Sequence, residues 1–223
     1  MTLFRRVLLM ALFAFIAFGA TGQTKELPIP KEIPELPVVE NSIGYRQVFS
    51  FEDTTKNYYQ EIQLFLANYY KSAKDVIDLN IDLNDQSTGV IVAKAKFLIP
   101  TYGFNVMGKK YYQNLTNYIV DHQVTFEIKG NRVRATLNNF LVQEPPLDYT
   151  DFMGNVIRVD YPKKTIQEMI NFTKTPVLDD SLNDRINSGK RYGFSDFLNS
   201  FHIVCTSYLE GLESNLKQKK DDW

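Results

Sequence analysis

The chain has 223 residues, and its 25 basic and 26 acidic side chains give a formal net charge of −1 that offers no reason to expect a polyanionic partner such as a nucleic acid. It contains one cysteine, Cys205, so no disulfide can form within the chain, and a hydrophobic core must stabilise the folded state. The length is sufficient, because a chain of about 200 residues buries about 70% of the surface that it exposes when unfolded.

The first 22 residues have the pattern of a cleavable secretory signal peptide. Arg5 and Arg6 form a short positive region, and an apolar run follows over residues 8–18. This run is too short to span a bilayer core of about 30 Å. Ala20 and Gly22 are small, as a cleavage site requires, so we expect the mature chain to begin at residue 23. An uncleaved N-terminal anchor helix is the alternative.

The expected product is an exported protein, either periplasmic or extracellular. It is not expected to be a lipoprotein, because the single cysteine lies far from the predicted cleavage region. No later apolar stretch approaches ~18 residues, so no integral membrane segment is expected after cleavage.

Residues 23–43 are predicted to form a proline-rich linker. Each proline removes a backbone donor and holds the chain extended. Four of them occur among alternating charges: Pro28, Pro30, Pro34 and Pro37. A first strand within residues 36–39 is the alternative.

Residues 44–143 are predicted to form an α+β domain that opens with a strand and a helix. Residues 45–51 are rich in aromatic and β-branched side chains, as strands are. Thr54 or Thr55 is expected to cap a helix over residues 56–71, whose apolar side chains recur at helical spacing.

Strands with one polar face are predicted next. Residues 77–84 and 91–99 alternate between apolar and polar side chains and are joined by turn residues at 85–89. Lys94 and Lys96 lie on the polar face of the second strand.

The best-defined pair of strands is a hairpin of residues 118–128 and 133–141, with a turn at 129–131. Arg132 and Arg134 are expected on its polar face. The apolar face of its second strand is expected to carry Val133, Ala135, Leu137 and Leu141.

Residues 101–112 are predicted to form a looser segment, because the first eight of them match neither the helical nor the strand period. Glycines and a Lys-Lys pair accompany its aromatic side chains, and exposed aromatics beside cations are common at binding hot spots. The candidate binding residues of this segment are Tyr102, Phe104, Tyr111 and Tyr112. The alternative is that the segment folds back and seals one end of the core.

Residues 144–223 are predicted to form a helical extension packed on the same unit. A short strand at 156–159 precedes Pro162, which suits the first position of a helix. Residues 173–193 are polar and are expected to be irregular. Ser195 is expected to cap a long final helix, whose apolar stripe contains Phe197, Phe201, Val204, Tyr208 and Leu212. The fold class indicated by this order is α+β, a sheet with helices on one face.

Residues 45 to about 140 resemble an exported bacterial family of unknown function whose fold is like that of the TATA-box-binding protein (TBP). The resemblance rests on four segments, which are residues 45–51, 54–59, 88–94 and 126–134. Phe65 stands where the family tends to have tryptophan, and Ala93 and Ala95 stand where it often has glycine. The resemblance implies a curved antiparallel sheet with a helix packed on one face, plus a C-terminal helical extension. It implies no activity and no catalytic residues.

No metal site or cofactor is expected. The acids of residues 78–82 have calcium-loop spacing, but Leu83 and Gly89 occupy the positions where such a loop needs glycine and glutamate. His202 and Cys205 are one helical turn apart, which is too few ligands for zinc. His122 shares the apolar phase of its strand and is expected to be a hydrogen-bonded core histidine.

The sequence also lacks the glycine patterns of nucleophile elbows, dinucleotide sites and phosphate loops, so we do not expect an enzyme. Lys94, Lys96, Arg132 and Arg134 would form a basic patch for an anionic partner if their strands are neighbours. An ordinary solvated face is the alternative.

The leading hypothesis is a non-catalytic binding module of the bacterial cell envelope, with an envelope protein or a glycan as partner. One alternative is a carrier of a small apolar or sugar ligand between the sheet and the C-terminal helix. Another is a hydrolase whose carboxylates assemble in space.

Overall fold

The computed structural model describes residues 32–72, 76–107, 110–150, 153–175 and 182–218. The predicted signal peptide and the part of the predicted linker before residue 32, with Pro28 and Pro30, therefore lie outside the described residues. The helices are α2 (Tyr58–Ser72), α3 (Ile166–Lys174) and α4 (Leu182–Lys217). The strands are β1 (Val38–Val39), β2 (Ser42–Ile43), β3 (Tyr45–Ser50), β4 (Val76–Asp85), β5 (Val90–Met107), β6 (Lys110–Lys129), β7 (Arg132–Gln143), β8 (Leu147–Thr150), β9 (Val156–Val159) and β10 (Lys164–Thr165).

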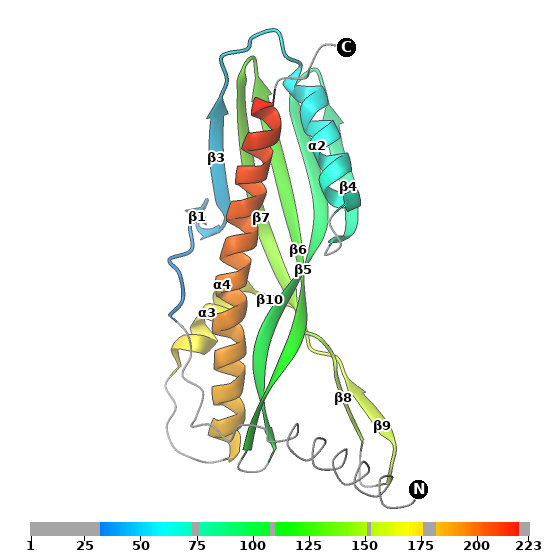
Figure 1. The fold of residues 1–223 in the computed structure, drawn as a ribbon, viewed down its shortest axis with the longest axis vertical. Coiled ribbons are helices and arrows are strands. Elements are labelled where there is room, and N and C mark those ends of the chain that lie inside the picture. The colour runs from blue at the N-terminus through cyan, green and yellow to red at the C-terminus, as the bar shows by residue number, and fades with distance from the viewer. Residues whose placement is uncertain (1–31, 73–75, 108–109, 151–152, 176–181, 219–223) are drawn as a thin grey trace, which may run out of the picture.

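One antiparallel sheet organises the molecule. Its strand order is β10–β7–β6–β5–β4, and β3 also pairs with β7. β1 pairs with β2 and β8 with β9 in two small separate ribbons. Figure 1 shows an elongated molecule in which the twisted β5–β6 hairpin runs most of the length, beside α4. This confirms the α+β fold class and the curved antiparallel sheet with helices on one face.

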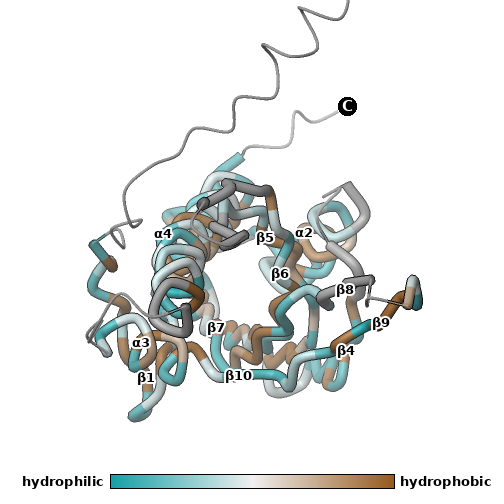
Figure 2. Tube along the Cα trace, turned by 90° about the horizontal axis from the view of Figure 1, so that it is seen from below, coloured by the Kyte–Doolittle hydropathy of each residue, from teal (hydrophilic) through white to brown (hydrophobic). Residues whose placement is uncertain are grey.

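The two faces of the sheet differ in what covers them. Figure 2 shows α2 and α4 together on one side of the sheet, which we call the inner face; the opposite side is the outer face. Alternate residues of β5 and β6 point to the inner face, as period-two pleating requires. They are all buried: Ile91, Ala93, Ala95, Phe97, Ile99, Tyr118, Val120, His122, Val124 and Phe126.

Helix α4 covers the inner face with its apolar stripe. Phe197, Phe201, Tyr208 and Leu212 are fully buried, as the spacing predicts. The Phe201 ring lies 4.8 Å from the ring of Phe140 on β7. Burial of this stripe supplies most of the reason for the helix to form here, because isolated helices are marginal in water.

The predicted start of the final helix is wrong. Helix α4 begins at Leu182, and Ser195 lies within it, where its hydroxyl donates to the carbonyl of Tyr192 over 2.8 Å. Gly189 and Gly193 lower the helix propensity of the first turns, which is why that segment looks irregular. Phe194, next to Gly193, packs on Tyr118 of β6, and tertiary packing of this kind overrides the local preference.

The helix starts predicted at residues 54–56 and 162 are also displaced. The Asn57 side chain accepts from the Gln60 amide and so caps α2, in place of Thr54 or Thr55. Thr165 caps α3 in a reciprocal capping box with Glu168, three residues after the predicted proline start.

A β-bulge changes the orientation of the end of β7. Asp121 on β6 opposes Leu141, whereas Gln123 opposes Asn138, so β7 has one extra residue between these pairs. The prediction that Leu141 shares the apolar face of Val133 is therefore wrong. Beyond the bulge Phe140 and Val142 are buried, while Leu141 is 42% exposed on the outer face.

The prediction of a loose segment over residues 101–112 is also wrong. β5 and β6 continue to pair through this region, with Tyr102 opposite Leu115 and Met107 opposite Lys110. Asp196 of α4 anchors the hairpin, because its Oδ2 accepts from the Thr101 hydroxyl and from the Tyr102 amide, each over 2.6 Å. Long-range pairing thus makes strands of residues whose pattern alone shows no period.

A search of the described helices finds none that combines the length and the apolar character needed to cross a membrane.

Candidate functional site

The outer face carries the sequence-predicted candidates whose side chains the structure describes. Tyr102, Lys94 and Lys96 are outward residues of β5, and Arg132 and Arg134 are outward residues of β7. Tyr102 is 50% exposed. Alternation along each strand places all five on one side of the sheet.

Phe104, Tyr111 and Tyr112 lie in the far end of the β5–β6 hairpin. Their backbone register is given by the pairs Phe104–Gln113, Asn105–Tyr112 and Val106–Tyr111. Their side chains lie outside what the structure describes.

The four basic candidates do not form a single patch. Lys94 is level with Gln123 on β6, and Arg134 is level with Glu127, four residues further along that strand and about 13 Å away. Lys94 and Arg134 each also have an acidic neighbour. Lys94 Nζ lies 2.7 Å from Asp82 Oδ2, and Arg134 pairs with Glu127. The Arg134 guanidinium holds the pKa of the Glu127 carboxyl below its usual range.

A hollow of about 420 Å³ lies on the outer face beside Lys94 and Lys96. Its surface is mainly apolar, and Leu141 contributes to it. Amide and charged side chains surround this apolar area: Asn80, Lys94, Lys96, Asp121, Gln123 and Asn139. This volume falls in the range of small-ligand pockets, roughly 300–1,000 Å³.

The bulge in β7 shapes this hollow. Asn139 has φ 56°, a left-handed conformation that asparagine tolerates better than most residues. Its amide donates to Gln123 Oε1 over 3.4 Å. Bulges of this kind commonly redirect side chains next to binding sites. Here the bulge brings Leu141 and Asn139 to the outer face together.

A second exposed apolar area lies further along the hairpin. Tyr102 and Leu115 are directly opposite each other, and Leu115 is 58% exposed. Leu98 and Ile119 form another outward pair between this area and the hollow, and both are partly exposed. The outer face therefore offers apolar contact area at two places along one hairpin.

The two histidines have structural surroundings. His122 is buried, stacks on Phe97 with ring centroids 3.8 Å apart, and its Nε2 lies 3.2 Å from the hydroxyl of Tyr70. Burial lowers the pKa of His122 to about 4, so it is neutral near pH 7. The expectation of a hydrogen-bonded core histidine is confirmed.

His202 and Cys205, which are one helical turn apart, have different surroundings. His202 Nδ1 lies 2.9 Å from the Tyr45 hydroxyl. Cys205 is fully buried, and burial raises the pKa of its thiol. Among the described residues, no group of three or more His, Cys, Asp or Glu side chains is arranged to hold a metal ion.

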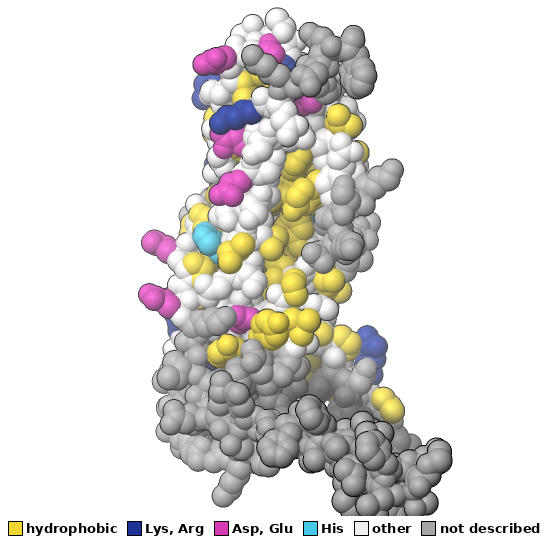
Figure 3. Space-filling model, in the orientation of Figure 1, with side chains coloured by type: hydrophobic (Ala, Val, Ile, Leu, Met, Phe, Trp, Pro, Cys, Tyr) yellow, Lys and Arg dark blue, Asp and Glu magenta, His cyan; other side chains and the backbone are white. Residues whose placement is uncertain are grey.

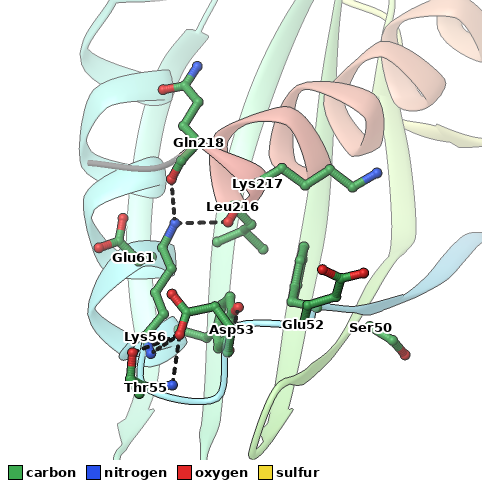
Figure 4. Close-up of a pocket in the computed structure, with 11 residues that line it drawn as sticks. Ser50, Glu52, Asp53, Thr55, Lys56, Glu61, Leu216, Lys217 and Gln218 are labelled. Carbon is green, nitrogen blue, oxygen red and sulfur yellow. Dashed lines mark hydrogen bonds between the residues drawn. The ribbon is translucent and has the colours of Figure 1, made fainter. Parts of the chain in front are cut away.

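A pocket of about 660 Å³ lies where α2 begins and α4 ends, and Glu52, Asp53 and Glu61 line it. Figure 4 shows Glu52 and Glu61 on opposite sides of it. Asp53 accepts hydrogen bonds from Thr55, which lower the pKa of its carboxyl. Lys56 donates to the carbonyls of Leu216 and Gln218 and so caps the end of α4. These contacts stabilise the two helix ends.

A groove of about 470 Å³ separates α2 from the end of α4. Phe65, Tyr69 and Gly211 are among the residues that line it. Figure 3 shows an apolar strip between the two helices on this side of the molecule. The rings of Phe65 and Tyr69 both contact Tyr208, at centroid distances of 5.5 and 4.8 Å, so they also belong to the core.

The sequence prediction missed Leu141, Asn139 and Asp121 at the hollow. The sequence does contain a signal for Leu141 and Asn139. Two asparagines precede Phe140, an apolar residue in the wrong phase for an uninterrupted strand. The left-handed backbone of Asn139 lies in the bulge, and the extra residue returns Phe140 to the inner face and turns Leu141 outward.

Two solved structures are similar to this chain, whereas no protein-family model and no curated protein matches its sequence. A TBP-like protein from Parabacteroides distasonis superposes with a TM-score of 0.52 at 12% identity, over 83% of this chain and 99% of that one. A DUF4468 family protein from Bacteroides ovatus has a TM-score of 0.45 at 16% identity, over 78% and 90% of the two chains. The first comparison establishes the shared architecture, and the resemblance to a TBP-like fold is thereby confirmed.

Proposed function

We propose that the protein is a non-catalytic binding module of the bacterial cell envelope, which holds a partner against the outer face of its sheet. The observation that carries this proposal is the contrast between the faces. Helices cover the inner face, whereas the outer face presents Tyr102, Leu115 and Leu141, each at least 42% exposed, beside a hollow. Exposed apolar side chains grouped on one face commonly mark an interaction surface.

The location in the envelope rests on the N-terminal sequence. Two arginines, an apolar run and small residues follow one another as in secretory signal peptides. Intact-mass analysis of the exported protein tests this part. We expect a chain that begins near Gln23, and a mature chain that retains Arg5 and Arg6 would contradict it.

The proposal that the module is not catalytic rests on the hydrogen bonds and the pKa of a pocket carboxylate. A general acid at neutral pH needs a raised pKa. Asp53, in the pocket that contains three carboxylates, has a lowered pKa because it accepts hydrogen bonds from a turn. The carrier alternative has less support because the α4 side chains that face the sheet are fully packed, including Phe197 and Phe201.

Site-specific photo-crosslinking in the producing cell tests the binding surface. A photoreactive phenylalanine analogue replaces Leu115 or Leu141 on the outer face. The matched control position is Ile203, which is 61% exposed on the solvent side of α4. We expect a discrete adduct from at least one outer-face position and none from the control. Equal adducts from all three positions, or none from either leucine, would contradict the proposal.

A further inference from the structure

The hollow beside the β7 bulge has the chemistry of a saccharide site. We propose that it binds a neutral, polyhydroxylated ligand, namely one or two sugar residues of a glycan. This inference rests on the proposed function and names the ligand class for one part of the same face. Four observations carry it: the apolar surface, the surrounding amides, the balanced charge and two acceptor oxygens without donors.

The apolar surface suits one face of a pyranose ring. Leu141 is an exposed aliphatic side chain within the hollow. A sugar ring presents C–H groups on its faces and hydroxyls around its edge. Leu141 would therefore pack against the ring face, while polar groups at the edge of the hollow reach the hydroxyls.

The polar groups around the hollow can both donate and accept. Asn80, Gln123 and Asn139 each carry an amide with two donors and an acceptor oxygen. Hydroxyl groups also do both, so amides and sugar hydroxyls are complementary. The hydrogen bond from Asn139 to Gln123 Oε1 is long at 3.4 Å, so a ligand hydroxyl can compete with it.

The charges near the hollow do not favour an ionic ligand. Lys94 pairs with Asp82, and Asp121 pairs with Lys163. A phosphate or sulfate would meet these carboxylates, and a metal ion would meet the lysines. With Lys96 also beside them, the local cations exceed the acids by only one charge.

Two acceptor oxygens here have no hydrogen-bond donor in the described part of the chain. Asp121 Oδ1 belongs to a residue that lines the hollow, and Asn138 Oδ1 belongs to the residue of β7 next to the lining residue Asn139. A covered acceptor without a donor is unfavourable, so a ligand that supplies hydroxyl donors gains affinity from satisfying it. Both oxygens are buried, so a ligand reaches them only when neighbouring groups move. Lys94 and Lys163 beside the site are long, and their side chains are 63% and 47% exposed.

An NMR titration of the ¹⁵N-labelled mature chain tests the inference. The probes are glucose, galactose, mannose, N-acetylglucosamine and their homodisaccharides, each at millimolar concentration. We expect at least one of them to shift the side-chain amide signals of Gln123 and Asn139 saturably. A fully sulfated disaccharide serves as the ionic comparator, and we expect it to bind more weakly.

Two matched variants locate the site. Leu141→Ala removes the apolar contact and should weaken saccharide binding about tenfold or more. Leu115→Ala removes another exposed leucine from the same face, outside the hollow, and should leave binding unchanged. The amide spectra show directly whether each variant is folded.

The inference is overturned if no probe shifts these amides, if the sulfated disaccharide binds more tightly, or if both leucine variants weaken binding equally. Its failure is distinguishable from failure of the proposed function. A protein adduct in the crosslinking experiment without any saccharide shift would refute the glycan and leave the binding module standing. Absence of both signals would refute both.

Discussion

The inner and outer faces belong to the same strands, yet their polar groups differ in their hydrogen-bond partners. On the inner face His122 contacts the Tyr70 hydroxyl, and Asp196 accepts from Thr101. On the outer face Asp121 Oδ1 and Asn138 Oδ1 have no donor within the described residues. The inner-face groups named here are paired within the chain, although the buried Tyr208 hydroxyl has no hydrogen-bond partner among the described residues. The outer face has two acceptor oxygens whose hydrogen-bonding capacity a partner can use.

Because of this difference, we expect stability to depend mainly on the inner face and binding on the outer face. Side chains on the inner face are restrained by packing on two sides, so changes there alter the free energy of unfolding. Side chains on the outer face contact the sheet on one side only, so changes there should alter binding with little effect on folding. Variants on each face, and changes of pH, test this separation.

Phe201→Ala should reduce the free energy of unfolding by about 3–5 kcal/mol, because Phe201 is fully buried and its removal leaves a cavity. Denaturant melts measure the effect. Leu141→Ala, on the outer face, is the matched control and should change stability by less than about 1 kcal/mol. A loss under about 1 kcal/mol for Phe201→Ala would show that α4 is not packed as described.

Acidification should destabilise the protein through His122. Its folded-state pKa is about 4, below the usual value of 6.5, so the unfolded state binds the proton first as the pH falls. This group's contribution is complete above about pH 6.5, decreases from there to about pH 4, and amounts to roughly 3 kcal/mol at most. Urea melts across this range measure it.

His122→Gln provides the comparison, because glutamine cannot titrate but can still hydrogen-bond to Tyr70. The variant should lose part of the pH dependence between pH 6.5 and 4, whereas His202→Gln should retain it. If the wild type and His122→Gln lose the same free energy of unfolding between pH 6.5 and 4, the buried histidine does not cause the pH dependence.

The double variant Tyr102→Ala, Leu115→Ala should change the free energy of unfolding by less than about 1 kcal/mol, because both side chains are at least half exposed. Thermal and denaturant melts check this. A loss of several kcal/mol would mean that this part of the hairpin seals the core, and the distinction between the faces would fail there.

Arg134→Gln should raise the pKa of Glu127 toward its ordinary value, because the Arg134 guanidinium lowers it. The lowered pKa stabilises the fold above the ordinary carboxyl pKa, and this contribution disappears as the pH falls through the lowered value. Both groups are partly exposed and solvent screens the pair, so the loss of stability at neutral pH should be small.

An NMR titration of the Glu127 carboxyl measures the shift. Arg132→Gln is the control, because Arg132 lies opposite Lys129 in the sheet. An unchanged Glu127 pKa in Arg134→Gln would mean that the ion pair does not form in solution.

The parts of the fold that depend on local periodicity could be predicted from the amino-acid sequence alone. Period-two alternation gave the inward residues of β5 and β6, and helical spacing gave the buried stripe that includes Phe197 and Phe201. The turn residues 129–131 gave the β6–β7 hairpin. The outward positions of Lys94 and Arg134 followed from the same alternation, because a strand leaves few alternatives once one face is apolar.

Tertiary structure alone decided what depends on partners distant in sequence. Residues 101–107 become a strand because β6 pairs with them and Asp196 anchors them. The first turns of α4 are helical despite two glycines, and Phe194, which follows them, packs on Tyr118 of β6. The hollow exists because the extra residue in β7 turns Leu141 outward, opposite Asp121. A bulge is defined by the register of two strands, and the pattern of one strand does not contain that register.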